Sequence, residues 1–305
     1  MDPATISASI VVGAIANVSF ACAVGACLAM LMLGNVPPLT LRRLQRFAVG
    51  SALALIVADT FNLLLEAALM SGSTPGTVFA ELIPVLTQSH FGAAWSTGFV
   101  GLIIWTGLLA RTRQGGRVTR MGAALFAAAV FAFSKAASSH AADAGDFALS
   151  EWIHWVHLCA TATWAGLVIA SGLCVLPMLR SYPNSQVLAP FAGRLSVTAT
   201  LALVAILMSG AYNAERGLGG SFWTLTRSDW GLILATKLVL VAAAIVLGGV
   251  NRIVYLPRIR SSTPSSAARS FLAILRIEAV TMIGVLIAAA ILAHTAPGAP
   301  VNGGS

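Results

Sequence analysis

The sequence has 305 residues, of which 58% are hydrophobic and only 9% carry a charged side chain, and its mean hydropathy is +0.88. Charged residues make up about a quarter of an ordinary soluble domain, so this composition excludes one and indicates a protein whose solvent is a lipid bilayer. The net charge of +8 does not indicate nucleic-acid binding. Most of the basic residues lie in or next to the short segments between apolar runs, where they face anionic lipid head groups.

Eight apolar runs follow one another along the chain, each close to the ~20 residues that a helix needs to cross the hydrocarbon core. Membrane strands are excluded because the runs are too long and do not alternate with polar residues. We therefore predict an all-α fold, a polytopic membrane helix bundle of about eight transmembrane helices. The predicted spans lie near 8–33, 47–70, 92–110, 118–138, 152–179, 190–213, 231–250 and 271–294.

Arginine residues are concentrated in alternate loops, whereas the intervening loops are mainly acidic. Basic loops face the cytoplasm, so this alternation predicts that both chain termini lie on the outer side of the membrane. An acid-rich segment at 139–151 separates the first four spans from the last four. We predict an N-terminal membrane half, 1–150, and a C-terminal membrane half, 151–305. We find no convincing internal sequence repeat.

In this orientation all the histidines lie at the outer ends of spans; they are His90, His140, His154, His157 and His294. His154 and His157 are three residues apart, so both imidazoles project from one helical face within reach of a single ion. Imidazole binds copper and zinc, and reduced copper also accepts thioether sulfur, which Met208 is placed to supply. The alternative is that these side chains merely favour the membrane interface. We expect a metal site centred on His154 and His157 and completed by His294, His90 or His140.

Ionisable residues also occur inside the spans. Asp59, Asn62 and Glu66 share one face of the second span, and the only two lysines, Lys135 and Lys237, lie in the fourth and seventh. Such residues are costly in lipid and mark transport pathways, so we predict that these five residues line one. The alternative is that an acid and a lysine pair to join two helices.

Near the inner end of the eighth span, Glu278 and Arg276 are expected to form a local ion pair, with an inner gate as the alternative. The sequence contains no triad-like order of serine, histidine and acid, and no Gly-rich phosphate loop followed by lysine. Hydrolase and nucleotide-driven pump functions therefore have no support, and we do not expect an enzyme.

Short motifs over about residues 150–295 resemble the copper resistance protein D (CopD) family. The motifs are His154-Trp-Val-His157, Trp164-Ala-Gly166, Arg194, Ser209-Gly-Ala-Tyr-Asn213, Gly231 to Lys237, Gly248-Gly-Val-Asn251-Arg252 and Arg276-Ile-Glu278. The eight-span layout also agrees with that family.

The resemblance implies a multi-pass protein of the bacterial inner membrane that transports copper ions, inward, beside a periplasmic copper-binding partner of the CopC type. The family's histidine, Trp-x-Gly pattern and intramembrane lysine fall on His157, Trp164, Gly166 and Lys237. Two alternatives remain open. Instead of a transporter, the chain could be a membrane oxidoreductase that holds haem b or redox-active copper between helices. It could also be a docking partner for a periplasmic copper chaperone, without transporting copper itself.

Overall fold

The computed structural model describes residues 3–33, 36, 38–72, 77–111, 116–143, 145–179, 185–218, 224–261 and 265–295. Within these ranges every regular element is a helix. Eight helical segments there are long and apolar enough to cross a membrane. The prediction of an all-α membrane protein with eight spans is therefore confirmed.

Six of the spans are single helices, namely α1 (Pro3–Met32), α2 (Pro38–Ser71), α4 (His90–Ala110), α5 (Arg117–Ala137), α8 (Ser185–Leu218) and α12 (Ser265–Ala293). The fifth span joins α6 (Leu149–Ala170), η2 (Ser171–Val175) and α7 (Leu176–Leu179). The seventh joins α10 (Asp229–Val250), η3 (Asn251–Tyr255) and α11 (Leu256–Ser261). The short elements outside the spans are α3 (Val78–Gln88), η1 (His140–Ala142) and α9 (Thr224–Arg227).

Two features of these helices differ from the predicted spans. Helix α2 begins at Pro38, earlier than the predicted span 47–70, and the seventh span continues to Arg260, beyond the predicted span 231–250. Both extensions contain arginines, which are good helix formers, so the helices continue into the head-group region. Helix α3 was not predicted. It buries Val78 and Val85 against Ala67 of α2 while its other face stays exposed, which is typical of a helix lying along a membrane interface.

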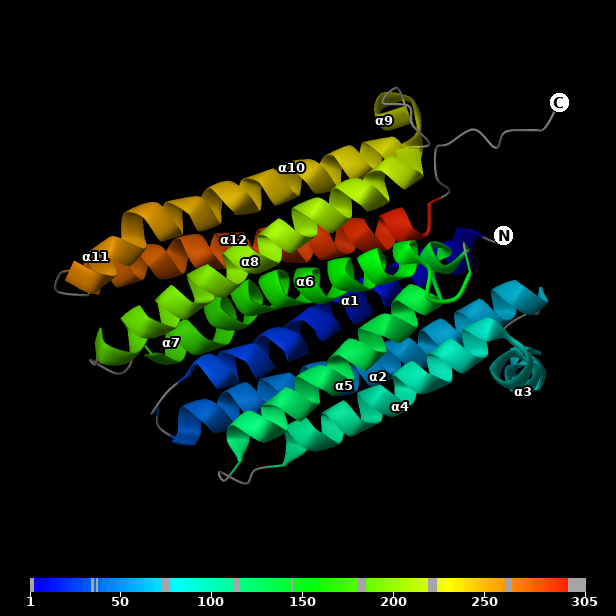
Figure 1. Ribbon diagram of the computed structural model, residues 1–305, viewed down its shortest axis with the longest axis horizontal. Helices are drawn as coiled ribbons and strands as arrows, with labels where there is room; N and C mark the ends of the chain where they lie inside the picture. The colour runs from blue at the N-terminus through cyan, green and yellow to red at the C-terminus, as the bar shows by residue number, and fades with distance from the viewer. Residues whose placement is uncertain are drawn as a thin grey trace.

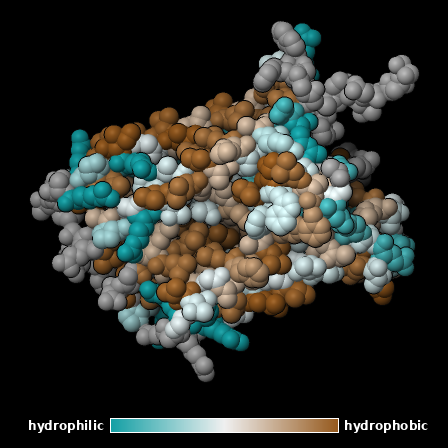
Figure 2. Space-filling model, in the orientation of Figure 1, coloured by the Kyte–Doolittle hydropathy of each residue, from teal (hydrophilic) through white to brown (hydrophobic). Residues whose placement is uncertain are grey.

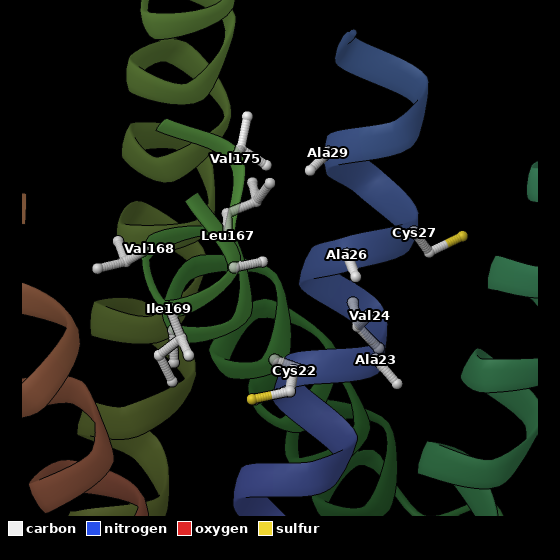
Figure 3. Packing of buried hydrophobic residues seen from close by; sticks show 14 of the residues in the cluster. Cys22, Ala23, Val24, Ala26, Cys27, Ala29, Leu167, Val168, Ile169 and Val175 are labelled. Atoms are coloured by element: carbon white, nitrogen blue, oxygen red, sulfur yellow. The ribbon is translucent and has the colours of Figure 1, made fainter. Parts of the chain in front are cut away.

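Helix α1 lies at the centre of the bundle, where it contacts α2, α5, α6 and α12 (Figure 1). Its crossing with α6 is very close: a Cβ added to Gly25 would lie 1.9 Å from the carbonyl carbon of Gly166. Small residues allow membrane helices to approach in this way. Figure 3 shows the surrounding core, in which the stretch of α1 that carries Cys22 to Ala29 lies beside the stretch that carries Leu167 to Val175, with Ala29 directed toward Val175. This contact joins the two halves of the chain.

The start of α1 and the end of α12 lie at the same end of the bundle (Figure 1). Figure 2 shows that hydrophobic side chains cover most of the middle of this face and that hydrophilic ones gather toward its two ends. This distribution suits a bilayer around the middle of the helices. Placement of the termini on the periplasmic side stays a prediction.

The fifth and seventh spans share a helix–π-helix–helix arrangement that the sequence analysis did not predict. Each has a helix of 22 residues, then a π-helical segment, then Leu-Pro at the start of a short helix. Pro177 and Pro257 each lack an N–H and crowd the carbonyl four residues earlier. The wider π turn accommodates that carbonyl. The repeat is local and covers only a few residues, which is why sequence comparison of the halves does not reveal it.

Candidate metal centre of the C-terminal half

His154 and His157 lie side by side near the start of α6. Their ring centroids are 6.4 Å apart and the ring planes differ by 19°. An ion bonded to one nitrogen of each ring at ~2.0 Å would lie about 3 Å from each ring centre. Two rings at this separation are therefore within the span of one metal ion.

Ser209 of α8 fixes the orientation of His157. Its hydroxyl donates to the carbonyl oxygen of Ala205 at 2.6 Å, so its oxygen is left as an acceptor. His157 Nδ1 lies 3.0 Å from that oxygen and must therefore carry the proton and donate it. Nε2 of His157 is then unprotonated, with a lone pair available for a metal ion. A hydrogen bond of this kind is typical of metal-binding histidines.

Asn213 of α8 contacts the other ring. Its amide nitrogen lies 3.4 Å from His154 Nδ1, so in this orientation Nδ1 accepts a hydrogen bond and the ring proton lies on Nε2. Half a turn of the amide would bring its oxygen to Nδ1 instead and would free Nε2. Ser209 and Asn213 are four residues apart, so one face of α8 supports both histidines.

Lys237 brings a positive charge to the pair. Its ammonium interacts electrostatically with both imidazoles, and Arg216 interacts with that of His154. By helical rise, His157 and Lys237 each lie ~12 Å beyond the start of their helix, so α6 and α10 present them at a similar depth. Within the described ranges no ion pair joins Lys237 to an acid.

The other histidines lie elsewhere. His90 Nε2 is 3.0 Å from Asp146 Oδ1, and both side chains are exposed. His294 donates from Nδ1 to the carbonyl oxygen of Ala290 at 2.8 Å and packs against Gly13 of α1. His140 begins η1, but its side chain is outside what the structure describes. No set of three or more histidine, cysteine or acidic side chains suited to a metal ion occurs among the described residues.

The predicted pathway residues of the N-terminal half do not join the histidine pair. Asp59 Oδ1 lies 2.7 Å from Lys135 Nζ, and the Asp59 side chain is only 2% exposed. The pair lies between α2 and α5, while Asn62 and Glu66 are half-buried further along α2. Met208 is 72% exposed on the surface of α8, although Ser209 beside it reaches His157. The thioether therefore does not face the imidazoles in this structure.

Two family models match the chain. Residues 3–149 match the N-terminal domain described as copper resistance protein D-like, and residues 189–292 match copper resistance protein D. Together they cover most of the sequence. The chain belongs to the copper resistance protein D family.

A curated relative agrees with this assignment. The CopD-family chain is 25% identical over 273 residues to the inner membrane protein YebZ of Escherichia coli (strain K12). The aligned region covers 85% of this chain and 89% of that protein. No solved structure matches the chain. With its eight apolar helices, this CopD-family member is a multi-pass inner membrane protein.

Sequence reasoning missed the contacts of two residues of this CopD-family protein and gave a third the wrong surroundings. Ser209 and Asn213 stood in a motif that carried the resemblance, but only the packing of α8 on α6 reveals their contacts with the histidines. The expectation for Glu278 was wrong. Arg276 is exposed and forms no ion pair with it in the described structure, and Glu278 is 3% exposed. The two side chains point to different faces of α12, because residues two apart lie far apart around a helix.

Proposed function

We propose that this CopD-family protein carries copper ions across the inner membrane into the cell, and that His154 and His157 bind the ion near the outer side. The observation that carries this proposal is the contact of His157 Nδ1 with the Ser209 hydroxyl, which leaves Nε2 of His157 free to bind an ion beside a second imidazole. Imidazole nitrogen is a suitable ligand for copper. The description of the matching family, copper resistance protein D, supports copper as the ion.

The surroundings of the pair suit transport better than storage. Only two imidazoles meet there among the described side chains, and the ammonium of Lys237 repels a cation bound between them. A transported ion must bind strongly enough to enter and weakly enough to leave. Lys237 therefore acts as the group that limits the affinity and promotes release.

Copper binding at both rings requires a change at His154. The amide of Asn213 turns by half a turn, its oxygen accepts from Nδ1, and Nε2 becomes available to the ion. The ion itself would come from a periplasmic copper-binding protein of the CopC type. This partner follows from the family resemblance and from the predicted outward position of the pair.

The experiment compares wild type with His154→Ala/His157→Ala. We expect the double variant to lose copper accumulation in cells and to bind copper about 100-fold more weakly when purified, because both ligands are gone. His90→Ala is the matched control, since it removes an exposed histidine paired with Asp146. Wild-type copper accumulation by the double variant would overturn the proposal. A Soret band that disappears in the double variant would favour haem ligation instead.

A further inference from the structure

Glu278 is a buried carboxyl group in the middle of α12. Its residue is 3% exposed, and helical rise places it roughly 20 Å from either end of the helix. No hydrogen bond or ion pair joins it to another residue in the ranges that the structure describes. The outer histidine pair does not use this group.

The carboxyl group packs against α10. A Cβ added to Gly248 would lie 3.0 Å from Oε1 of Glu278, so the absence of a side chain at Gly248 leaves room for it. One turn further along, Asn251 is 4% exposed, and neither its side-chain nitrogen nor its oxygen has a hydrogen-bond partner. Residues three apart share a helical face. An unpartnered carboxyl and an unpartnered carboxamide therefore occur at neighbouring levels of two packed helices.

Both π-helical segments contact α12. In η2, a Cβ added to Gly172 would lie 3.2 Å from the carbonyl oxygen of Leu275, one turn before Glu278. The adjacent Ser171 is fully buried, and its hydroxyl has no partner. Buried polar groups are almost always hydrogen-bonded, and exceptions point to a water or an ion. π-helical turns also occur frequently at functional sites.

The other charged and titratable groups on the packed elements are engaged elsewhere. Arg252 of η3 is exposed and donates to the Ser196 carbonyl and the Thr200 hydroxyl of α8. Arg258 of α11 lies over the ring of Tyr255, 5.8 Å from its centroid.

Other titratable groups on these elements also have partners away from Glu278. Arg260 packs against Gly193, Cys174 of η2 interacts with Cys22 of α1, and Glu151 of α6 accepts from the Phe147 N–H. His154 and His157 interact with Lys237, His294 bonds the Ala290 carbonyl, and Arg276 is exposed. Glu278 is thus left without a counter-charge among the described residues.

An ionised carboxylate without a counter-charge is strongly disfavoured in apolar surroundings, whereas the protonated group is neutral. We propose that Glu278 and Asn251 form a cation site in the inner part of the C-terminal half, which holds a proton while empty and gives it up when the transported ion enters. When the ion enters, the O–H bond of Glu278 breaks, the proton passes to water on the outer side, and the carboxylate balances the charge of a monovalent copper ion. When the ion leaves to the inner side, the carboxylate takes up a proton from water there and the O–H bond forms again. Oxygen ligands hold reduced copper weakly, so the ion passes on.

The two sites lie at different levels of the C-terminal half. Lys237 and Gly248 are about three turns apart on one face of α10, so ~16 Å of helix separates the levels of the histidine pair and Glu278. Thr161, one turn after His157 on α6, also has a buried hydroxyl without a partner. The identity of the ion rests on the proposed function, but the proton on Glu278 does not.

Infrared spectroscopy tests the proton directly. At neutral pH we expect wild-type protein to show the C=O stretch of a protonated carboxyl group, which Glu278→Gln removes and Glu278→Asp shifts. Glu215→Gln is the matched control, because Glu215 is exposed at the outer end of α8 and its removal should leave the band intact. Absence of the band in wild type, or its persistence in Glu278→Gln, would overturn the proposal.

Proteoliposomes with an enclosed pH dye test the coupling. We expect copper entry to move protons in wild type and in Glu215→Gln, and proton movement to fall at least tenfold in Glu278→Gln while copper affinity at the histidine pair changes less than twofold. Asn251→Leu should reduce proton movement by a smaller factor. Unchanged proton movement in Glu278→Gln would overturn the coupling. Absence of copper flux in wild type would overturn the proposed function, while the infrared band would still decide whether Glu278 holds a proton.

Discussion

The two halves of the chain each place one acid and one lysine deep in the bundle, but they arrange them differently. In the N-terminal half Asp59 and Lys135 meet at 2.7 Å and neutralise each other. In the C-terminal half the Lys237 ammonium interacts electrostatically with two histidines, and Glu278 of α12 has no partner among the described residues. Paired charges hold helices together, while unpaired ones remain available to a passing ion. The ion pair of the first half joins two helices, and we propose that the unpaired groups of the second half carry the chemistry.

The largest expected effect concerns stability. Asp59→Asn should destabilise the protein by about 3 kcal/mol, because it leaves the Lys135 ammonium without its buried partner. Glu278→Gln should change stability by less than ~1 kcal/mol, since no partner is lost. Unfolding in detergent measures both, and Asp59→Asn/Lys135→Met should recover most of the loss. Equal destabilisation by the two single variants would break the comparison.

A smaller effect is expected from the hydroxyl that orients His157. Ser209→Ala should weaken copper binding about tenfold or more, because Nδ1 loses its acceptor and the ring loses its fixed tautomer. Competition with a coloured copper chelator measures the affinity. Thr97→Ala is a suitable control, since its hydroxyl also bonds a carbonyl one turn back but lies in the N-terminal half. An unchanged affinity would show that Ser209 does not support a ligand.

The two lysines should respond differently to the same substitution, because one lies in each half of the chain. Lys237→Met should tighten copper binding about tenfold, because a like charge beside the ion is removed. It should also slow copper release in a stopped-flow measurement. Lys135→Met should leave copper affinity unchanged, although it destabilises the fold. Weaker binding in Lys237→Met would contradict the role given to this lysine.

The smallest effect is expected at Met208. Met208→Leu should leave copper affinity within about twofold of wild type, because this residue is 72% exposed on the face of α8 that points away from the bundle. Replacing one apolar side chain by another of similar size keeps the lipid contact. A loss above tenfold in the chelator competition would show that the thioether reaches the ion, as the sequence predicted.

Much of the fold could be predicted because its signals are local. Runs of apolar residues gave the eight spans, and they missed α3 because eleven residues with one apolar face are too short for that signal. The helical extensions at α2 and in the seventh span were missed for a related reason. Arginine ends an apolar run but does not end a helix.

The candidate site was only partly accessible from the sequence. The closeness of His154 and His157 follows from their spacing of three on one helix, which holds whatever surrounds them. The contacts of Ser209 and Asn213 depend on how α8 packs against α6, and no local pattern encodes that packing. Glu278 looked like an interfacial group because Arg276 is near in sequence, yet the two lie on different faces of α12.

The sequence by itself determined that this is an eight-span membrane protein with two adjacent imidazoles, because hydropathy and helical periodicity are properties of consecutive residues. Only the tertiary structure decided which charges are neutralised. Asp59 meets Lys135 across two helices, while Glu278 packs against Gly248 and meets no cation among the described residues. Whether an ion pair forms depends on interhelical distances of a few ångströms, and these are set by side-chain packing between segments far apart in the chain.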